Sequence, residues 1–174
     1  MRGMRVAALH ALFTILAGAS LSAELVSFEN ARFTLDIPAD WKKAKGPDDG
    51  NFLYREAPGG EGSFSVYKLK VAKDHRAELQ GTLKHRVDAI TKSGLKVTAD
   101  VKGTKQDFDG KHAVFAVIPV EAGLGDRKVK FSYYLVLIDA KNLVVIMQAT
   151  LPRKPPDKLR EATLGIIQSF REKE

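Results

Sequence analysis

The sequence contains no cysteine. Disulfide bonds, cysteine metal ligands and the lipid-carrying cysteine of a bacterial lipoprotein are therefore excluded. The chain also lacks an Asn-x-Ser/Thr glycosylation acceptor, because Asn30, Asn51 and Asn142 all fail this pattern. Small secreted eukaryotic domains usually rely on disulfides. Both absences favour a bacterial envelope protein or a bacterial secreted protein.

The excess of one charge sign is small. The 174 residues include 28 Lys or Arg against 21 Asp or Glu, and two of the basic residues, Arg2 and Arg5, precede every acidic one. Without these two, the net charge is about +5, which is well short of the dense basic clusters of a nucleic-acid-binding protein. We expect no nucleic-acid partner. The length and the ordinary balance of apolar and charged residues predict one globular domain.

The only long apolar run lies near the N-terminus. Arg2 and Arg5 precede an apolar stretch from Val6 to Ala19, and small residues continue to Ala23. This order is typical of a secretory signal peptide. We therefore predict a leader at residues 1–23, with cleavage between Ala19 and Ala23.

An uncleaved membrane anchor is the alternative to a cleaved leader. The apolar run is short for a span of about 20 residues, and it contains a histidine. A cleaved leader predicts a single mature domain at residues 24–174, located in the periplasm or secreted.

Along this domain, segments whose apolar residues recur at every second position are followed by segments whose apolar residues recur at helical spacing. Phe33, Leu35 and Ile37 alternate with polar residues, as in a half-buried strand. Apolar residues at helical spacing predict helices at residues 74–93 and 157–171. The same reasoning predicts strands at residues 25–28, 32–37, 51–55, 63–71, 95–101, 104–108, 112–120, 127–139 and 143–151.

The last two predicted strands indicate how the layers are arranged. Residues 131–138 and 143–151 carry apolar side chains at both odd and even positions. A strand that is apolar on both faces must be covered on both faces. We therefore expect an α+β fold in which an antiparallel β-sheet is sandwiched by the two helices.

The segment at residues 31–42 resembles the opening signature of PsbP-like domains, which is similar to F-x-[IL]-x-[IV]-P-x-x-W. Here the pattern is carried by Phe33, Leu35, Ile37, Pro38 and Trp41. The Asp109-Gly110 pair before the strand at 112–120 and the Ser169-Phe170 pair that closes the last predicted helix also match. The resemblance implies a PsbP-like α/β/α fold and a binding or assembly protein without enzymatic activity, and it carries over no catalytic, cofactor or metal residue.

The residues themselves also predict no catalytic, cofactor or metal site. His75 and His85 lie ten residues apart on one predicted helix, about 15 Å of rise, which is too far for a shared metal. A small envelope hydrolase is the alternative function, because Ser63, Asp109 and His112 supply the residue types of a hydrolytic site. No sequence spacing brings these three together.

The candidate partner-binding residues are basic. Arg127, Lys128 and Lys130 follow a predicted loop at residues 121–126, and Lys128 and Lys130 share one strand face. They suit an acidic protein or an anionic envelope component; a solvated surface is the alternative. Trp41 is the fourth candidate, either as an exposed ring for ligand stacking or as a hydrophobic plug of the core.

Overall fold

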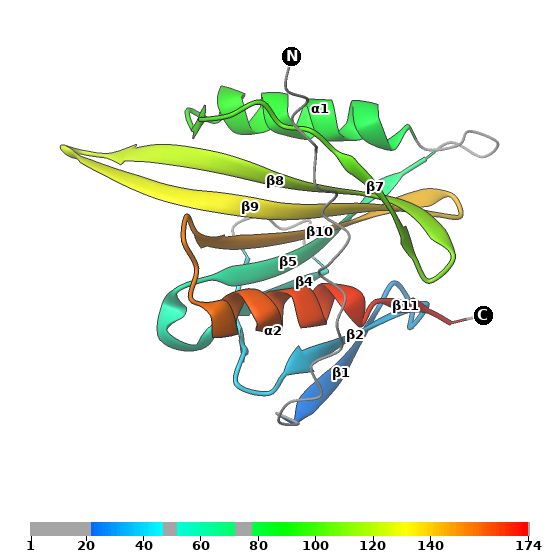
Figure 1. The fold of residues 1–174 in the computed structure, drawn as a ribbon. Helices are drawn as coiled ribbons and strands as arrows, with labels where there is room; N and C mark the ends of the chain where they lie inside the picture. Colours follow the sequence, from blue (N-terminus) through cyan, green and yellow to red (C-terminus); the bar gives the residue numbers. More distant parts are fainter. Residues whose placement is uncertain (1–21, 47–51, 72–77, 174) are drawn as a thin grey trace, which may run out of the picture.

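The structure is a computed structural model, and it describes residues 22–46, 52–71 and 78–173. A long antiparallel sheet crosses the middle of the molecule, with one helix above it and a second helix and a small sheet below it (Figure 1). Most of the predicted leader, residues 1–21, lies outside the described residues. The chain enters the fold at β1.

The small sheet has three strands in the order β1-β2-β11. They are β1 (Ala23–Phe28), β2 (Phe33–Pro38) and β11 (Arg171–Glu172). β1 and β2 form the first predicted hairpin, in antiparallel register. β11 was not predicted; it continues from the last helix and pairs with β2.

The large sheet has eight strands, and its pairings are antiparallel. Its path is β3-β4-β5-β10-β9-β8-β6, and β7 pairs with β8. The strands are β3 (Lys42–Lys43), β4 (Leu53–Glu56), β5 (Ser63–Lys70), β6 (Lys96–Val97), β7 (Thr104–Phe108), β8 (Lys111–Leu124), β9 (Arg127–Ala140) and β10 (Leu143–Pro152). A short 3-10 helix, η1 (Pro58–Gly60), lies between β4 and β5.

The predicted turns join the central strands. Asp109 and Gly110 both have positive φ, 54° and 71°, which is the conformation of the tight turn that Asp-Gly favours between antiparallel strands. The β9–β10 turn likewise has Asn142 at φ 67°. The predicted Asp-Gly hairpin is confirmed, with β7 and β8 paired on either side of it.

Both predicted helices are present. α1 (Leu79–Lys92) begins with the Glu78 side chain accepting a hydrogen bond from the Gly81 N–H, and Gly94 follows at φ 87°. The predicted start of this helix, at residue 74, lies outside the described residues. α2 (Asp157–Gln168) starts where expected and ends before the chain extends into β11.

Two apolar clusters cover the two faces of the large sheet. The α1-side core packs α1 on β8, β9 and β10, and it includes Leu79, Leu83, Ile90, Val114, Ile118, Leu135, Leu137 and Ile146. The α2-side core joins α2, both sheets and the C-terminal segment, and it includes Phe33, Leu35, Ile37, Trp41, Phe64, Val136, Met147, Ile166 and Phe170.

The α+β class and the antiparallel pairing are confirmed. A sheet sandwiched simply by two helices is not confirmed. The layer that contains α2 also contains the β1-β2-β11 sheet, and α2 lies against β2 as well as β10 (Figure 1). Within the described residues, no helix is both long and apolar enough to cross a membrane.

Candidate functional site

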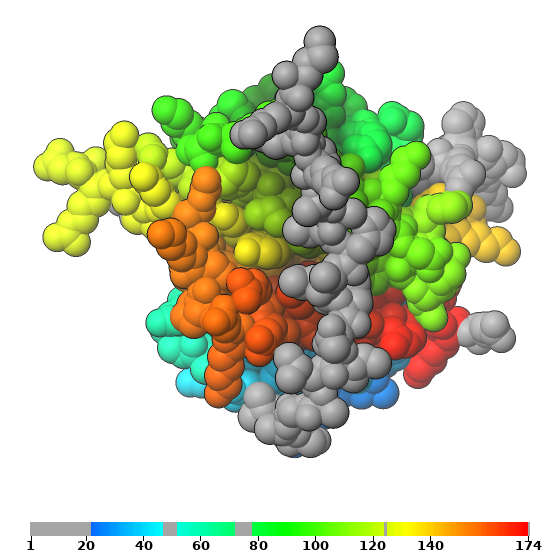
Figure 2. All heavy atoms as spheres, in the orientation of Figure 1, coloured from blue at the N-terminus to red at the C-terminus, as the bar shows by residue number. Residues whose placement is uncertain are grey.

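The β8–β9 hairpin extends beyond the rest of the sheet. β9 pairs with β10 only from Phe131 onward, so residues 127–130 have β8 as their strand partner. The hairpin protrudes from one side of the molecule, drawn in yellow (Figures 1 and 2). The predicted loop at 121–126 is therefore corrected: β8 continues to Leu124, and the turn is only Gly125 and Asp126. Continuous cross-strand pairing holds this segment extended.

Three lysines surround one glutamate on a single face of this hairpin. Glu121 lies directly opposite Lys130 on β9 and directly opposite Lys96 on β6. Directly opposed residues project from the same face of a sheet. The Lys128 ammonium completes the group, with its Nζ 3.1 Å from Glu121 Oε1. We call Lys96, Lys128 and Lys130 the hairpin basic cluster.

The cluster carries more positive charge than Glu121 neutralises. The hydrogen bond from Lys128 lowers the pKa of Glu121, and the charges of Lys128, Lys130 and Lys96 lower that pKa further against the opposing effect of burial. Glu121 is therefore a carboxylate at neutral pH. One carboxylate among three ammonium groups leaves a net positive surface, and the Lys128 side chain is 72% exposed.

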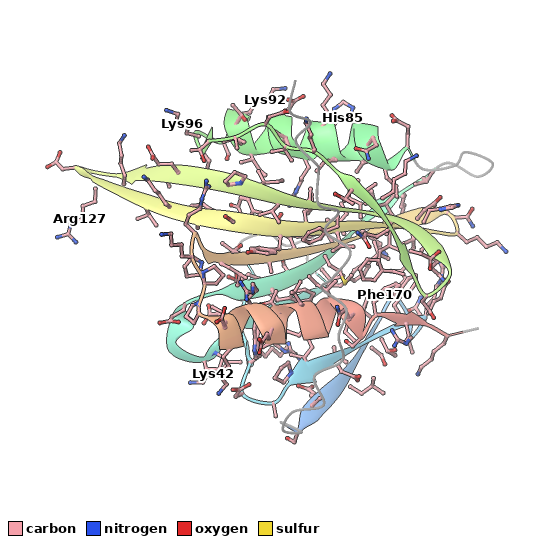
Figure 3. All side chains as sticks on the ribbon, in the orientation of Figure 1. Lys42, His85, Lys92, Lys96, Arg127 and Phe170 are labelled. Atoms are coloured by element: carbon pink, nitrogen blue, oxygen red, sulfur yellow. The ribbon has the colours of Figure 1, made fainter. Side chains whose placement is uncertain are left out.

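Arg127 lies on the other face of the hairpin. Side chains alternate along β9, so Arg127 and Val129 point away from Lys128 and Lys130, as the sequence predicted. Arg127 lies near the tip (Figure 3), and Val129 beside it is 42% exposed. The hairpin thus presents a doubly basic face and, on its reverse, one arginine next to an exposed apolar side chain.

Trp41 is not part of this surface. Its side chain is only 4% exposed and belongs to the α2-side core. Its backbone N–H donates to the Pro38 carbonyl, which closes the turn after β2 and directs the ring inward. The prediction of Trp41 as an exposed stacking residue is therefore wrong. The alternative, a tryptophan buried in the hydrophobic core, is confirmed.

The residues of the alternative hydrolase do not converge. Strand register aligns Ser63 with Ile118 through β10 and β9, so Ser63 lies three strands away from β8. His112 lies a further six residues along β8, about 20 Å at the rise of a strand. Asp109 is a turn residue, as expected. The structure thus gives Ser63 no neighbouring histidine base from this trio.

Within residues 22–46, 52–71 and 78–173, no group of three or more His, Cys, Asp or Glu side chains is placed to hold a metal ion. His85 lies exposed on α1 (Figure 3), and His75 lies outside the described residues.

No protein-family model matches the sequence, and no curated protein matches it either. Solved structures do match its fold. The solution structure of cyanobacterial PsbP from Synechocystis sp. PCC 6803 has a TM-score of 0.65 and 12% sequence identity, and the match covers 93% of this chain and 99% of that one. The Ran-binding protein Mog1p of Saccharomyces cerevisiae has a TM-score of 0.60 at 13% identity, covering 88% of this chain and 96% of that one.

Two further solved structures share the fold. LpqN of Mycobacterium tuberculosis, described as involved in cell envelope biogenesis, has a TM-score of 0.53 at 12% identity, covering 87% of this chain and 91% of that one. The match to a Bacteroides thetaiotaomicron VPI-5482 protein covers 86% of this chain but only 48% of the longer one, at a TM-score of 0.59 and 13% identity. The chain has a PsbP-like fold, as the F-x-[IL]-x-[IV]-P-x-x-W resemblance implied.

Sequence reasoning missed one residue of the cluster, Lys96, and the Glu121 carboxylate that the cluster surrounds. Lys96 joins Lys128 and Lys130 only because β6 pairs with β8, a contact between segments 25 residues apart that no local pattern encodes. Glu121 was assigned to a loop because Gly123 and Gly125 follow it. The alternation of Ile118, Val120 and Ala122 on one side of this strand was the available signal for a longer strand.

Proposed function

We propose that this protein is an exported, non-enzymatic binding module that recognises an acidic protein surface through the β8–β9 hairpin. The observation that carries the proposal is the hairpin basic cluster, in which Lys128 and Lys130 of the protruding hairpin and Lys96 of the adjoining β6 surround the carboxylate of Glu121. A fixed ribbon presents these charges with little loss of backbone entropy on binding. The excess charge favours encounter with an acidic partner.

The solved structures with the same fold support a binding role. One is the Ran-binding protein Mog1p, and another is cyanobacterial PsbP. These likenesses concern the fold alone, so the partner must be argued from this chain's own surface. The predicted leader and the involvement of LpqN in cell envelope biogenesis support export. An acidic protein of the envelope is therefore the partner class that we propose.

The binding test compares matched charge variants. Lys128→Glu with Lys130→Glu reverses two charges in the cluster, whereas Lys84→Glu with Lys158→Glu makes the same net change on exposed positions of α1 and α2. Partners are captured from envelope extract by each immobilised protein at rising salt. We expect capture by wild type and by the α1/α2 variant to weaken as salt shortens the Debye length from about 8 Å.

The cluster variant should lose most of this capture already at physiological salt while remaining folded at the assay temperature, with a modest fall in melting temperature because two glutamates then face Glu121. Phosphatidylglycerol vesicles provide a second arm of the test. Retention of the cluster-dependent binding by vesicles, with no captured protein, would replace the acidic protein with an anionic lipid surface. Salt-independent capture, equal for the three proteins, would contradict the proposal.

Export has its own measurement. Intact mass of the protein from its native host should show a mature chain that begins after a residue between Ala19 and Ala23. A species that still carries Met1 would contradict cleavage, and it would leave the binding proposal untouched.

A further inference from the structure

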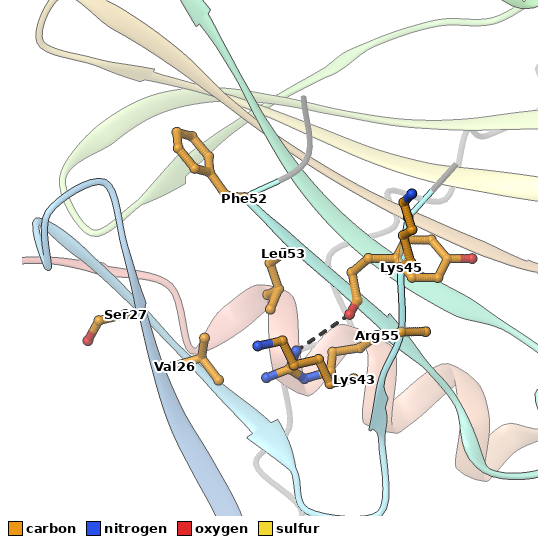
Figure 4. A pocket seen from close by; sticks show the side chains of 10 residues that line it. Val26, Ser27, Lys43, Lys45, Phe52, Leu53 and Arg55 are labelled. Carbon is orange, nitrogen blue, oxygen red and sulfur yellow. Dashed lines mark hydrogen bonds between the residues drawn. The ribbon is translucent and has the colours of Figure 1, made fainter. Parts of the chain in front are cut away.

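A cavity of about 410 Å³ lies where the edges of the two sheets meet, away from the β8–β9 hairpin. Residues of β1, of the β3 edge and of β4 line it (Figure 4). We call it the Arg55 pocket, after its most deeply buried charged residue. Its lining is Val26, Ser27, Lys43, Ala44, Lys45, Gly46, Phe52, Leu53, Tyr54 and Arg55.

Arg55 occupies a position that strand periodicity assigns to the core. Leu53 and Arg55 alternate with exposed or half-buried neighbours on β4, and both point toward the α2-side core. The Arg55 side chain is only 6% exposed. Burial of a guanidinium is costly unless its donors are satisfied. The side chain therefore requires hydrogen-bond acceptors inside the pocket.

The protein supplies few acceptors to Arg55. Its Nη1 lies 3.4 Å from the Tyr54 carbonyl oxygen, the contact drawn in Figure 4, and its Nη2 lies 3.5 Å from Glu24 Oε2. Both distances are long for hydrogen bonds. Within residues 22–46, 52–71 and 78–173, the buried Nε has no hydrogen-bond partner. Glu24 is itself 61% exposed, so its charge is largely solvated.

Two further cations line the same pocket. Lys43 lies directly opposite Arg55 in the β3–β4 pairing, and directly opposed like charges destabilise a sheet. Lys45 also lines the pocket, and neither lysine makes an ion pair within the described part of the chain. An oxyanion between these groups would relieve the repulsion and accept from the accessible part of the Arg55 guanidinium.

The remaining walls are partly apolar. Val26, Leu53 and Phe52 contribute hydrocarbon surface to the lining, and Phe52 is 36% exposed. A volume near 400 Å³ is within the range of small-molecule sites. We propose that the Arg55 pocket binds a small amphiphilic anion, with a carboxylate or phosphate group held by Arg55 and Lys43 and an apolar body against Val26 and Leu53.

The test uses ligands that share one tail. Octanoate and octyl phosphate carry the two candidate head groups, octan-1-ol carries the tail without charge, and inorganic phosphate carries a head group without a tail. Titration is followed by the ¹⁵N–¹H resonance of Arg55 Nε, which reports directly on the unpaired donor. We expect a saturable shift with at least one of the octyl anions, and binding about tenfold weaker or worse for octanol and for inorganic phosphate.

Matched variants locate the site without disturbing the buried arginine. Lys43→Gln removes a pocket charge, and Lys42→Gln removes the same charge from the neighbouring position, which faces the other side of β3. We expect Lys43→Gln to weaken anion binding about tenfold, as for loss of one charge-assisted hydrogen bond, and Lys42→Gln to leave it unchanged. Glu24→Gln should tighten binding severalfold, because Glu24 competes for Arg55 Nη2.

Several results would overturn the proposal. They are the absence of a saturable Arg55 Nε shift with either octyl anion, equal binding of octanol, and equal effects of the Lys42 and Lys43 variants. The pocket shares no residue with the hairpin basic cluster. Failure here is therefore distinguishable from failure of the proposed protein contact.

Discussion

The two faces of the large sheet are closed in different ways. The α2-side core is rich in aromatic rings: Phe33 and Phe170 are fully buried, with their centroids 5.5 Å apart and nearly parallel. The α1-side core lies under a single amphipathic helix and includes a polar contact, in which Arg86 Nη2 donates to Gln148 Oε1 at 3.1 Å beneath α1. Among the residues that the structure describes, the buried Arg86 Nε has no hydrogen-bond partner.

This difference has a consequence for stability. An aromatic core joined by strands from both sheets and by the C-terminal segment leaves a large void when one ring is removed. A helix that also shields a polar contact is held by fewer fully buried side chains: Leu79 and Ile90 are each 8% exposed. We therefore expect truncations to cost more on the α2 side than on the α1 side.

The largest effect is expected for Phe170→Ala. The ring is fully buried between α2 and the small sheet, and its removal should lower the free energy of unfolding by about 3–5 kcal/mol. Denaturant unfolding of the purified domain measures this. A loss below about 1 kcal/mol would mean that the C-terminal segment does not close the α2 side.

A smaller loss is expected for Leu83→Ala on the α1 side. Leu83 is 4% exposed and lies in the middle of the apolar stripe of α1. Because the edge of this core is partly exposed, its side chains can shift into the space that the leucine leaves. We therefore expect the free energy of unfolding to fall by about 2–3 kcal/mol, at the low end for a buried leucine. If Leu83→Ala costs as much as Phe170→Ala, the two faces contribute equally and the contrast between them is wrong.

On the α2 side, Glu172 near the C-terminus forms ion pairs with Arg32 and Lys111. Glu172 Oε1 accepts from Arg32 Nε at 2.6 Å, and Glu172 Oε2 lies 2.9 Å from Lys111 Nζ. Burial alone would raise the pKa of Glu172, but the hydrogen bonds from Lys111 and Arg32 outweigh burial and lower that pKa. A lowered folded-state pKa stabilises the protein above the ordinary glutamate pKa, and this contribution is lost as pH falls through the folded-state value.

Glu172→Gln should therefore cost about 1 kcal/mol at pH 7, the scale of a partly exposed ion pair. The difference between wild type and variant should shrink as pH falls below about 4.3, where a free glutamate is protonated, and vanish below the folded-state pKa. Urea unfolding from pH 7 to pH 3 measures the difference. A gap that stays constant in acid would assign the effect to packing of the side chain.

Local patterns were sufficient for most elements of this fold. The alternation of Phe33, Leu35 and Ile37, the Asp109-Gly110 turn and the stripes of both helices each depend on neighbours within a few residues, and all are present as predicted. β11 was missed because two residues form a strand only through pairing with β2, far away in the sequence.

The candidate sites were predicted less completely for the same reason. Lys128 and Lys130 were visible as a basic run, but their relation to Glu121 and Lys96 depends on strand register. Arg55 ended a predicted strand, and although its spacing from Leu53 placed it on the same strand face, its charge favoured an exposed position. Its environment is created by β1 and β3, which converge on β4 only in the folded chain.

The smallest effect is expected for Lys141→Ala, at the β9–β10 turn that joins the two central strands. Arg32 donates from Nη1 and Nη2 to the Lys141 carbonyl oxygen, both at 3.2 Å. Lys141 therefore contributes its backbone carbonyl, and not its side chain, to this contact with the α2 side. Alanine retains that carbonyl, and the lysine side chain is exposed. The free energy of unfolding should change by no more than about 0.5 kcal/mol. Arg32→Gln removes the charged donor both from this contact and from the ion pair with Glu172, and it should cost more, about 1 kcal/mol. Parallel unfolding curves test the pair: a Lys141→Ala loss equal to that of Arg32→Gln would show that the side chain, and not the backbone, connects this turn to the α2 side.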